Sequence, residues 1–218
     1  MPLSTPSRLM RGVLLALAAG VVALGAPAVR PDHAKVPGVV IAHSPKSSRV
    51  FLGSAGIAVL PDGSYLAKHD EFGPGSTEKV SAVTRVYRST DRGRTWTSIS
   101  RVDGLFWASI FVHRGAVYMM GTTAGHRHGH GVIRRSTDGG RTWTEPKDER
   151  SGRLFPDISY HTAPVPVVVH QGRIWRAMED EKGGTKWGVM FRAFMLSAPE
   201  DADLLVAANW TASNALPH

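Results

Sequence analysis

Acidic, imidazole and aromatic side chains gather in a few short segments of the chain. Segments 68–79 (KHDEFGPGSTEK) and 178–188 (MEDEKGGTKWG) are acidic, while 103–109 (DGLFWAS) and 156–164 (PDISYHTAP) carry aromatic residues. Carboxylates and imidazoles are the groups that transfer protons in enzymes, and aromatic rings stack on ligands. We therefore take Glu179 as a generic acidic catalytic candidate, and as candidate substrate-binding residues His69, Trp107, Tyr160, His161 and Asp180.

A run of histidines, TTAGHRHGHG (122–131), raises the question of a metal. His126, His128 and His130 alternate, so on one strand they would face the same way. In a glycine-rich loop, however, such histidines are more often solvated. We expect neither a metal site nor a cofactor.

The amino-acid composition excludes several classes of catalytic site and of binding partner. The chain has 218 residues, no cysteine, and 42% hydrophobic and 20% charged residues, which is ordinary for a globular protein. The lack of cysteine excludes a thiol nucleophile, a Cys-bound zinc and an iron–sulfur cluster. The net charge of +8 is spread along the chain without a nucleic-acid-binding motif. We expect no nucleic-acid partner.

The first 28 residues resemble a signal peptide. Arg8 and Arg11 precede the apolar run VLLALAAGVVALG, and Ala26 and Ala28 stand at the −3 and −1 positions of a cleavage site. The alternative is an N-terminal membrane anchor, for which the run is short. The sequence therefore predicts a secreted or periplasmic protein that has no contact with the membrane after cleavage.

The elements that would position the candidate residues are repeated. Three segments, 56–70, 109–122 and 166–179, each contain an apolar run, a turn with Gly63, Gly115 or Gly172, and an alternating strand. Glycine supplies the positive φ that tight hairpin turns need. A second hairpin follows each one, so the unit is four strands in about 50 residues, the period of a β-propeller blade. The pattern predicts an all-β fold of about three such blades rather than a helical solenoid.

The second hairpins share a turn motif. YRSTDRGRTW and RRSTDGGRTW give two clear copies, and the third is reduced to Ser197 and Trp210. Asp can accept backbone hydrogen bonds within a turn, Gly permits a left-handed step, and Trp anchors the returning strand. The residues expected to build these turns are Ser89, Asp91, Gly93, Trp96, Ser136, Asp138, Gly140 and Trp143.

This motif resembles the Asp-box repeats of the sialidase (neuraminidase) superfamily, whose catalytic domain is a six-bladed propeller. In that family the Asp boxes lie away from the active site. The resemblance thus implies that the substrate meets the opposite rim, where the acidic, histidine and aromatic segments fall. It also implies Asp70 as the acid/base residue and a carbohydrate as substrate, in a terminal-sugar glycosidase.

One segment departs from the family pattern. The family places an Arg of an R-I-P segment at the start of the first blade, and here the segment reads RVFLGSAGI. An alternative function is therefore a non-catalytic propeller that binds glycans or a protein, with Trp107, Tyr160 and Trp187 as its aromatic rim.

We predict a signal peptide at 1–28, an extended segment at 29–48 and a partial propeller at 49–218, with blades at 49–105, 106–158 and 159–218. Closed propellers use about four to eight blades. We therefore expect either an N-terminal fragment with an incomplete active site or two self-associating copies that complete a ring.

Overall fold

The computed structural model describes residues 32–77, 79–125, 127–184, 186 and 188–216. The predicted signal peptide, His126 and Trp187 lie outside the described residues. The chain divides into two units, Met1–Lys35 and Val36–His218. The described part of the first unit holds a single 3-10 turn, His33–Lys35.

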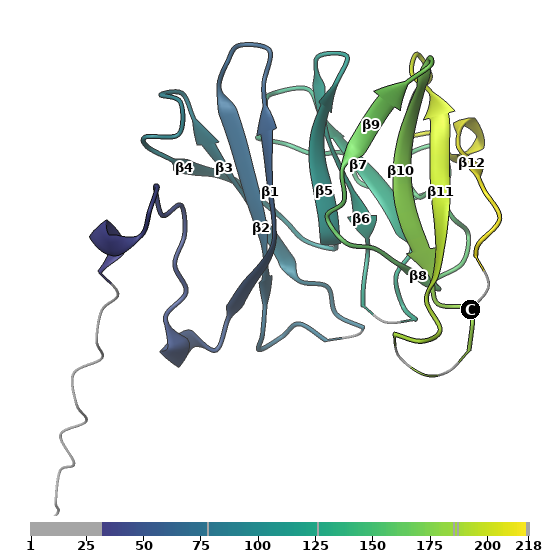
Figure 1. Ribbon diagram of the computed structural model, residues 1–218, viewed down its shortest axis with the longest axis horizontal. Helices are drawn as coiled ribbons and strands as arrows, with labels where there is room; N and C mark the ends of the chain where they lie inside the picture. The colour runs from purple at the N-terminus through teal and green to yellow at the C-terminus, as the bar shows by residue number, and fades with distance from the viewer. Residues whose placement is uncertain (1–31, 78, 126, 185, 187, 217–218) are drawn as a thin grey trace, which may run out of the picture. The chain divides into compact units, whose positions relative to one another are not determined.

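The second unit is built from antiparallel strands in three sheets (Figure 1). The first sheet has four strands in chain order, as the sequence pattern predicts. They are β1 (Phe51–Val59), β2 (Tyr65–Phe72), β3 (Val83–Ser89) and β4 (Thr97–Val102). This sheet is a complete propeller blade, which confirms the all-β partial propeller expected from the repeats.

The second sheet has three strands: β5 (Phe106–His113), β6 (Ala116–Thr122) and β7 (Gly131–Ser136). The fourth strand expected after the second Asp box does not form. Thr144 donates its backbone N–H to Arg135 O at 2.9 Å, and its hydroxyl accepts the Arg135 N–H at 2.9 Å. Two residues later Pro146 has no N–H to continue the ladder. The hydrogen bonding between β7 and the segment that follows the turn therefore ends after one residue, Thr144.

In the third sheet the innermost strand is interrupted. β8 (Tyr160–His161) and β9 (Val167–His170) pair with the two ends of β10 (Arg173–Asp180), because Pro164 and Pro166 lie between them. The outer strands are β11 (Arg192–Pro199) and β12 (Thr211–Ala212).

Two apolar layers hold the sheets together. Leu66 and Val86 of the first sheet pack against Ile110 and Met119 of the second. A second layer joins residues of the second sheet to residues of the third, among them Met120, Ile133, Ile174, Met178 and Leu196. Burial alternates along β10, as expected for a strand with one face on this core.

The two Asp-box turns have the same hydrogen bonds. Asp91 Oδ1 accepts from the Ser89 hydroxyl at 2.8 Å and the Thr95 N–H at 2.9 Å, and Trp96 Nε1 donates to Gly93 O at 3.0 Å. In the second turn the corresponding groups are Ser136, Asp138, Gly140, Thr142 and Trp143. In the third blade the hydroxyl of Ser197 instead accepts from Arg173 at 2.8 Å, so the degraded copy does not repeat this turn.

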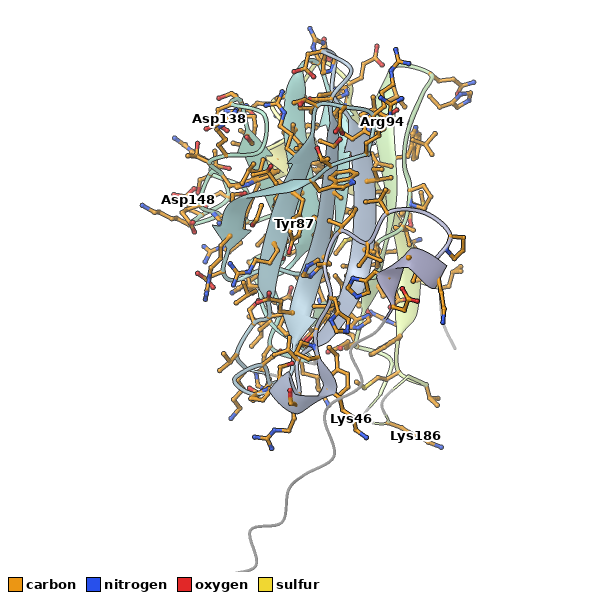
Figure 2. All side chains as sticks on the ribbon, turned by 90° about the vertical axis from the view of Figure 1, so that its left-hand side faces the viewer. Lys46, Tyr87, Arg94, Asp138, Asp148 and Lys186 are labelled. Carbon is orange, nitrogen blue, oxygen red and sulfur yellow. The ribbon has the colours of Figure 1, made fainter. Side chains whose placement is uncertain are left out.

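The strand registers fix the two ends of each blade. Tyr65 pairs with both Val59 and Ser89, so the β1–β2 turn and the first Asp box share one end. Glu71 pairs with Val83, which puts the β2–β3 loop at the other end. Figure 2 shows Asp138 and Arg94 toward the first end and Lys186 of the β10–β11 loop toward the opposite end. The acidic and aromatic segments lie at the latter, which we call the loop end.

Candidate functional site

Four of the candidate residues form one connected chain at the loop end, across all three sheets. Asp70 on β2 accepts the backbone N–H of Trp107 on β5 at 2.8 Å. The Trp107 indole lies against the His161 imidazole of β8, with ring centroids 4.4 Å apart. His161 Nδ1 lies 2.9 Å from Oε2 of Glu179 on β10. The sequence pattern placed Asp70 and Glu179 at the ends of predicted strands and left Trp107 and His161 outside the hairpin segments, and in the structure all four stand on strands.

Asp70 has no exposed surface. Its Oδ1 accepts from the Thr84 hydroxyl at 2.7 Å and lies 3.3 Å from Lys68 Nζ, whose side chain is equally buried. Its Oδ2 accepts the Trp107 N–H. Burial lowers the pKa of Lys68, and the Asp70 carboxylate opposes that shift. Both oxygens of Asp70 are therefore occupied by protein groups in this structure.

Trp107 occupies an irregular position in β5. Two residues, Trp107 and Ala108, lie opposite Gly121 because the pairing with β6 shifts between Phe106 and Ser109. The φ of Trp107 is 49°, in the left-handed region that large side chains rarely adopt. Its ring is half-buried, with the Phe106 ring 4.6 Å and the Phe72 ring 6.4 Å away.

His161 contacts two aromatic rings. The Trp107 ring lies 4.4 Å away at an interplanar angle of 47°, and the Phe191 ring stacks on it at 4.6 Å with an interplanar angle of 20°. The hydrogen bond from His161 lowers the pKa of Glu179 below its usual value, against an opposing effect of burial. The Glu179 side chain is 38% exposed, so an ionised carboxylate faces solvent beside an aromatic surface. We call Trp107, His161, Phe191 and Glu179 the aromatic–acid cluster.

Tyr160 and Asp180 do not join this cluster, because they are the strand neighbours of His161 and Glu179 and face the other side of the sheet. Tyr160 stacks on Phe155 at 4.0 Å, and burial raises the pKa of its hydroxyl. Asp180 accepts two hydrogen bonds from Arg192, at 2.8 and 2.7 Å. In this structure Tyr160 and Asp180 therefore contact other side chains of the protein rather than the aromatic–acid cluster.

His69 is likewise separated from Asp70 by the alternation of β2. Its Nε2 lies 3.0 Å from the Tyr87 hydroxyl, and burial lowers its pKa. Tyr87 is labelled on the face of the first sheet in Figure 2. Together with Val39, Ile41, Leu52 and Ile57, His69 and Tyr87 line an apolar cavity of about 550 Å³ on that face.

Lys68, Phe72, Thr84 and Phe191 also contact the candidate residues and were not predicted from the sequence. Lys68 and Phe72 stand two residues to either side of Asp70, so treating 65–72 as a strand would have placed all three on one face. Thr84 pairs directly with Asp70 across β2 and β3. Nothing local in the sequence marks Phe191.

No group of three or more His, Cys, Asp or Glu residues in the described part of the chain is arranged to hold a metal ion. Among the same residues no helix is long and apolar enough to span a membrane.

Comparison with known proteins supports the fold. No protein family and no curated protein matches the chain. Solved structures do resemble it. A Hadza microbial sialidase shares 16% identity, with a TM-score of 0.54 over 75% of this chain and 37% of its own. The α-L-arabinofuranosidase of Fusarium graminearum, solved with an iminosugar inhibitor, shares 15% identity, with a TM-score of 0.51 over 78% of this chain and 48% of its own.

An α-L-arabinofuranosidase from Lactobacillus brevis has 14% identity and a TM-score of 0.52, over 78% of this chain and 57% of its own. At such identities the similarity establishes a shared propeller fold. The chain spans about half or less of the length of the first solved structures that it matches.

Proposed function

We propose that the protein is a glycosidase-like propeller that binds the terminal sugar of a glycan at the loop end. The observation that carries this proposal is the aromatic–acid cluster. The rings of Trp107 and Phe191 both lie against His161, and the ionised Glu179 is hydrogen-bonded to that imidazole. A sugar ring offers an apolar face that can stack on an aromatic ring. Its hydroxyl groups can donate hydrogen bonds to a carboxylate.

The chemistry available to the cluster follows from its hydrogen bond. His161 Nδ1 is the donor of this bond, since an ionised carboxylate can only accept, and Nε2 is the ring nitrogen that the bond does not use. Glu179, with its lowered pKa, suits the role of a negative charge beside a developing oxocarbenium ion or of a base toward water. It does not suit the role of general acid, which needs a raised pKa.

Two arginines on strands at the loop end are paired with carboxylates, whereas Arg127 of the β6–β7 loop is exposed at the same end. A sialoside carboxylate calls for unpaired arginines. Arg85 and Arg192 at the loop end are paired with Glu71 and Asp180, at 3.1 and 2.7 Å. Within the described residues these guanidinium groups are already committed. The solved arabinofuranosidases of the same fold make arabinofuranosides a reasonable first substrate class.

A second candidate function is a glycan-binding module without hydrolysis. The observation that favours it is the enclosure of Asp70, the predicted acid, by Lys68, Thr84 and the Trp107 N–H. As an acid, Asp70 would need access to the glycosidic oxygen.

A panel of aryl glycosides, including arabinofuranosides and sialosides, together with a glycan array, tests both functions. Wild type is compared with Trp107→Ala and Glu179→Gln, and Trp175→Ala serves as the matched control because Trp175 lies on β10 near the opposite end. Hydrolysis that is lost in the two cluster variants and kept in the control supports the glycosidase. Binding with the same pattern but no hydrolysis supports the module. Neither binding nor hydrolysis by the wild type contradicts both.

A further inference from the structure

The side chain of the fully buried Asp70 is hydrogen-bonded to the main chain of Trp107. Asp70 Oδ2 accepts the backbone N–H of Trp107 at 2.8 Å, while Thr84 and Lys68 hold Oδ1. A buried carboxylate with three such partners has a fixed position. The first sheet therefore holds the backbone of the second sheet at the residue that begins the aromatic–acid cluster.

That backbone is strained. A left-handed tryptophan is a sparsely populated conformation that persists only where its surroundings impose it. Two surroundings do so here. Asp70 fixes the N–H, and Gly121 leaves room for the bulge, since a Cβ on Gly121 would overlap the Phe106 carbonyl oxygen and press on Ala108.

The same irregularity recurs in the first blade with a different side chain. Ser54 has a φ of 52°, and the pairing of β1 with β2 shifts between Gly53 and Gly56. The bulge is thus part of the repeated blade architecture. The presence of a large aromatic ring there is particular to the second blade, where it contacts His161 of the third.

We infer that Asp70 is a positioning residue for sugar binding. By holding the Trp107 main chain in its left-handed conformation, it sets the indole against His161 and so builds the wall that receives the apolar face of a sugar ring. This inference rests on the proposed function for its ligand. It gives Asp70 a different role from the acid implied by the sialidase resemblance.

The two roles differ in how Asp70→Asn and Asp70→Ala compare. Both substitutions are made together with Lys68→Met, so that no buried ammonium is left without a partner, and both double variants are compared with wild type, because Lys68→Met alone would leave the Asp70 carboxylate unpaired. Asparagine keeps a side-chain oxygen that can accept the Trp107 N–H, whereas alanine does not. For a positioning residue we expect sugar affinity within about threefold of wild type in the asparagine variant and about tenfold weaker in the alanine variant.

The Trp107 environment is followed without ligand by near-ultraviolet circular dichroism, with Trp107→Phe identifying the contribution of this indole. We expect that contribution to be kept in Asp70→Asn and lost in Asp70→Ala. Thr84→Val, which removes one donor to Asp70, should give an intermediate change and serves if the alanine variant does not fold.

Equal loss of turnover by about a hundredfold in both variants, with unchanged affinity, is the result expected of an acid and overturns the inference. An unchanged indole signal in Asp70→Ala also overturns it. If wild type binds no sugar but the indole signal follows Asp70 as expected, the proposed function fails while the positioning of Trp107 by Asp70 stands.

Discussion

His161 and Glu179 are direct partners across β8 and β10, and their side chains meet on one face with Nδ1 and Oε2 2.9 Å apart. Backbone pairing and side-chain hydrogen bond coincide, so the strand register itself sets the geometry of the dyad. A shift by one residue would bring Tyr160 or Asp180 to this face instead.

The first prediction concerns the pH dependence of this pair. Because the pKa of Glu179 is lower in the folded protein than its usual 4.5, its contribution to stability is present above that pH and is lost as the pH falls through the folded value. The urea midpoint of wild type should therefore fall more steeply between about pH 5 and pH 3 than that of Glu179→Gln. Glu149→Gln, at an exposed glutamate, should follow wild type. Parallel curves for wild type and Glu179→Gln would contradict the expectation.

A second prediction concerns the Asp-box turns at lower pH. Hydrogen bonds from Thr95, foremost that of its hydroxyl, lower the pKa of Asp91 to about 2. The stability that this carboxylate supplies is present above the unfolded value of about 3.9 and is lost toward pH 2. Urea titrations from pH 5 to pH 2 should show a shallower acid loss for Asp91→Asn than for wild type. Asp201→Asn, at an exposed turn position, is the control, and an acid loss as steep in Asp91→Asn as in wild type would count against the expectation.

A third prediction concerns the contact between the first two blades. The hydroxyl of Ser100 on β4 donates to Gly140 O at 2.6 Å and accepts from Trp143 Nε1 at 3.2 Å. Ser100→Ala should lower the free energy of unfolding by about 1 kcal/mol, since it removes both bonds at a half-buried contact. Ser98→Ala, at an exposed site on the same strand, should change it by less than about 0.5 kcal/mol. Equal effects in chemical denaturation would show that the contact adds nothing to stability.

A fourth prediction concerns the bulge that carries Trp107. Gly121→Ala should destabilise the protein by about 3 kcal/mol, because the new Cβ would overlap the backbone of β5 at Phe106 and Ala108. Gly172→Ala has nothing within 4 Å of its Cβ and should cost about 1 kcal/mol through its φ of 72° alone. The near-ultraviolet circular dichroism spectrum should differ from that of wild type in Gly121→Ala and match it in Gly172→Ala. The same dichroism in both would mean that the bulge tolerates a side chain at position 121.

The hairpins could be predicted because turn chemistry is local. Gly63, Gly115 and Gly172 do take positive φ, at 79°, 79° and 72°. The third blade is less regular, and there the prolines at 164 and 166 were the available sign that its inner strand would break.

The site was predicted less well, and for one recurring reason. His69–Asp70, Tyr160–His161 and Glu179–Asp180 are each pairs of neighbours, and on a strand neighbours point to opposite faces. Both members of each pair are candidates by residue type, and only the alternation of the strand separates them. The side of the strand that is buried depends on packing between distant blades, which no short segment encodes.

The hydrogen bond between Asp70 and the peptide nitrogen of Trp107 does not involve the side chain at position 107. The scaffold thus fixes where this side chain stands and leaves its identity open to selection. Under the proposed function, exchanging this residue would change the surface offered to a sugar while the bond to the backbone beneath it stays in place.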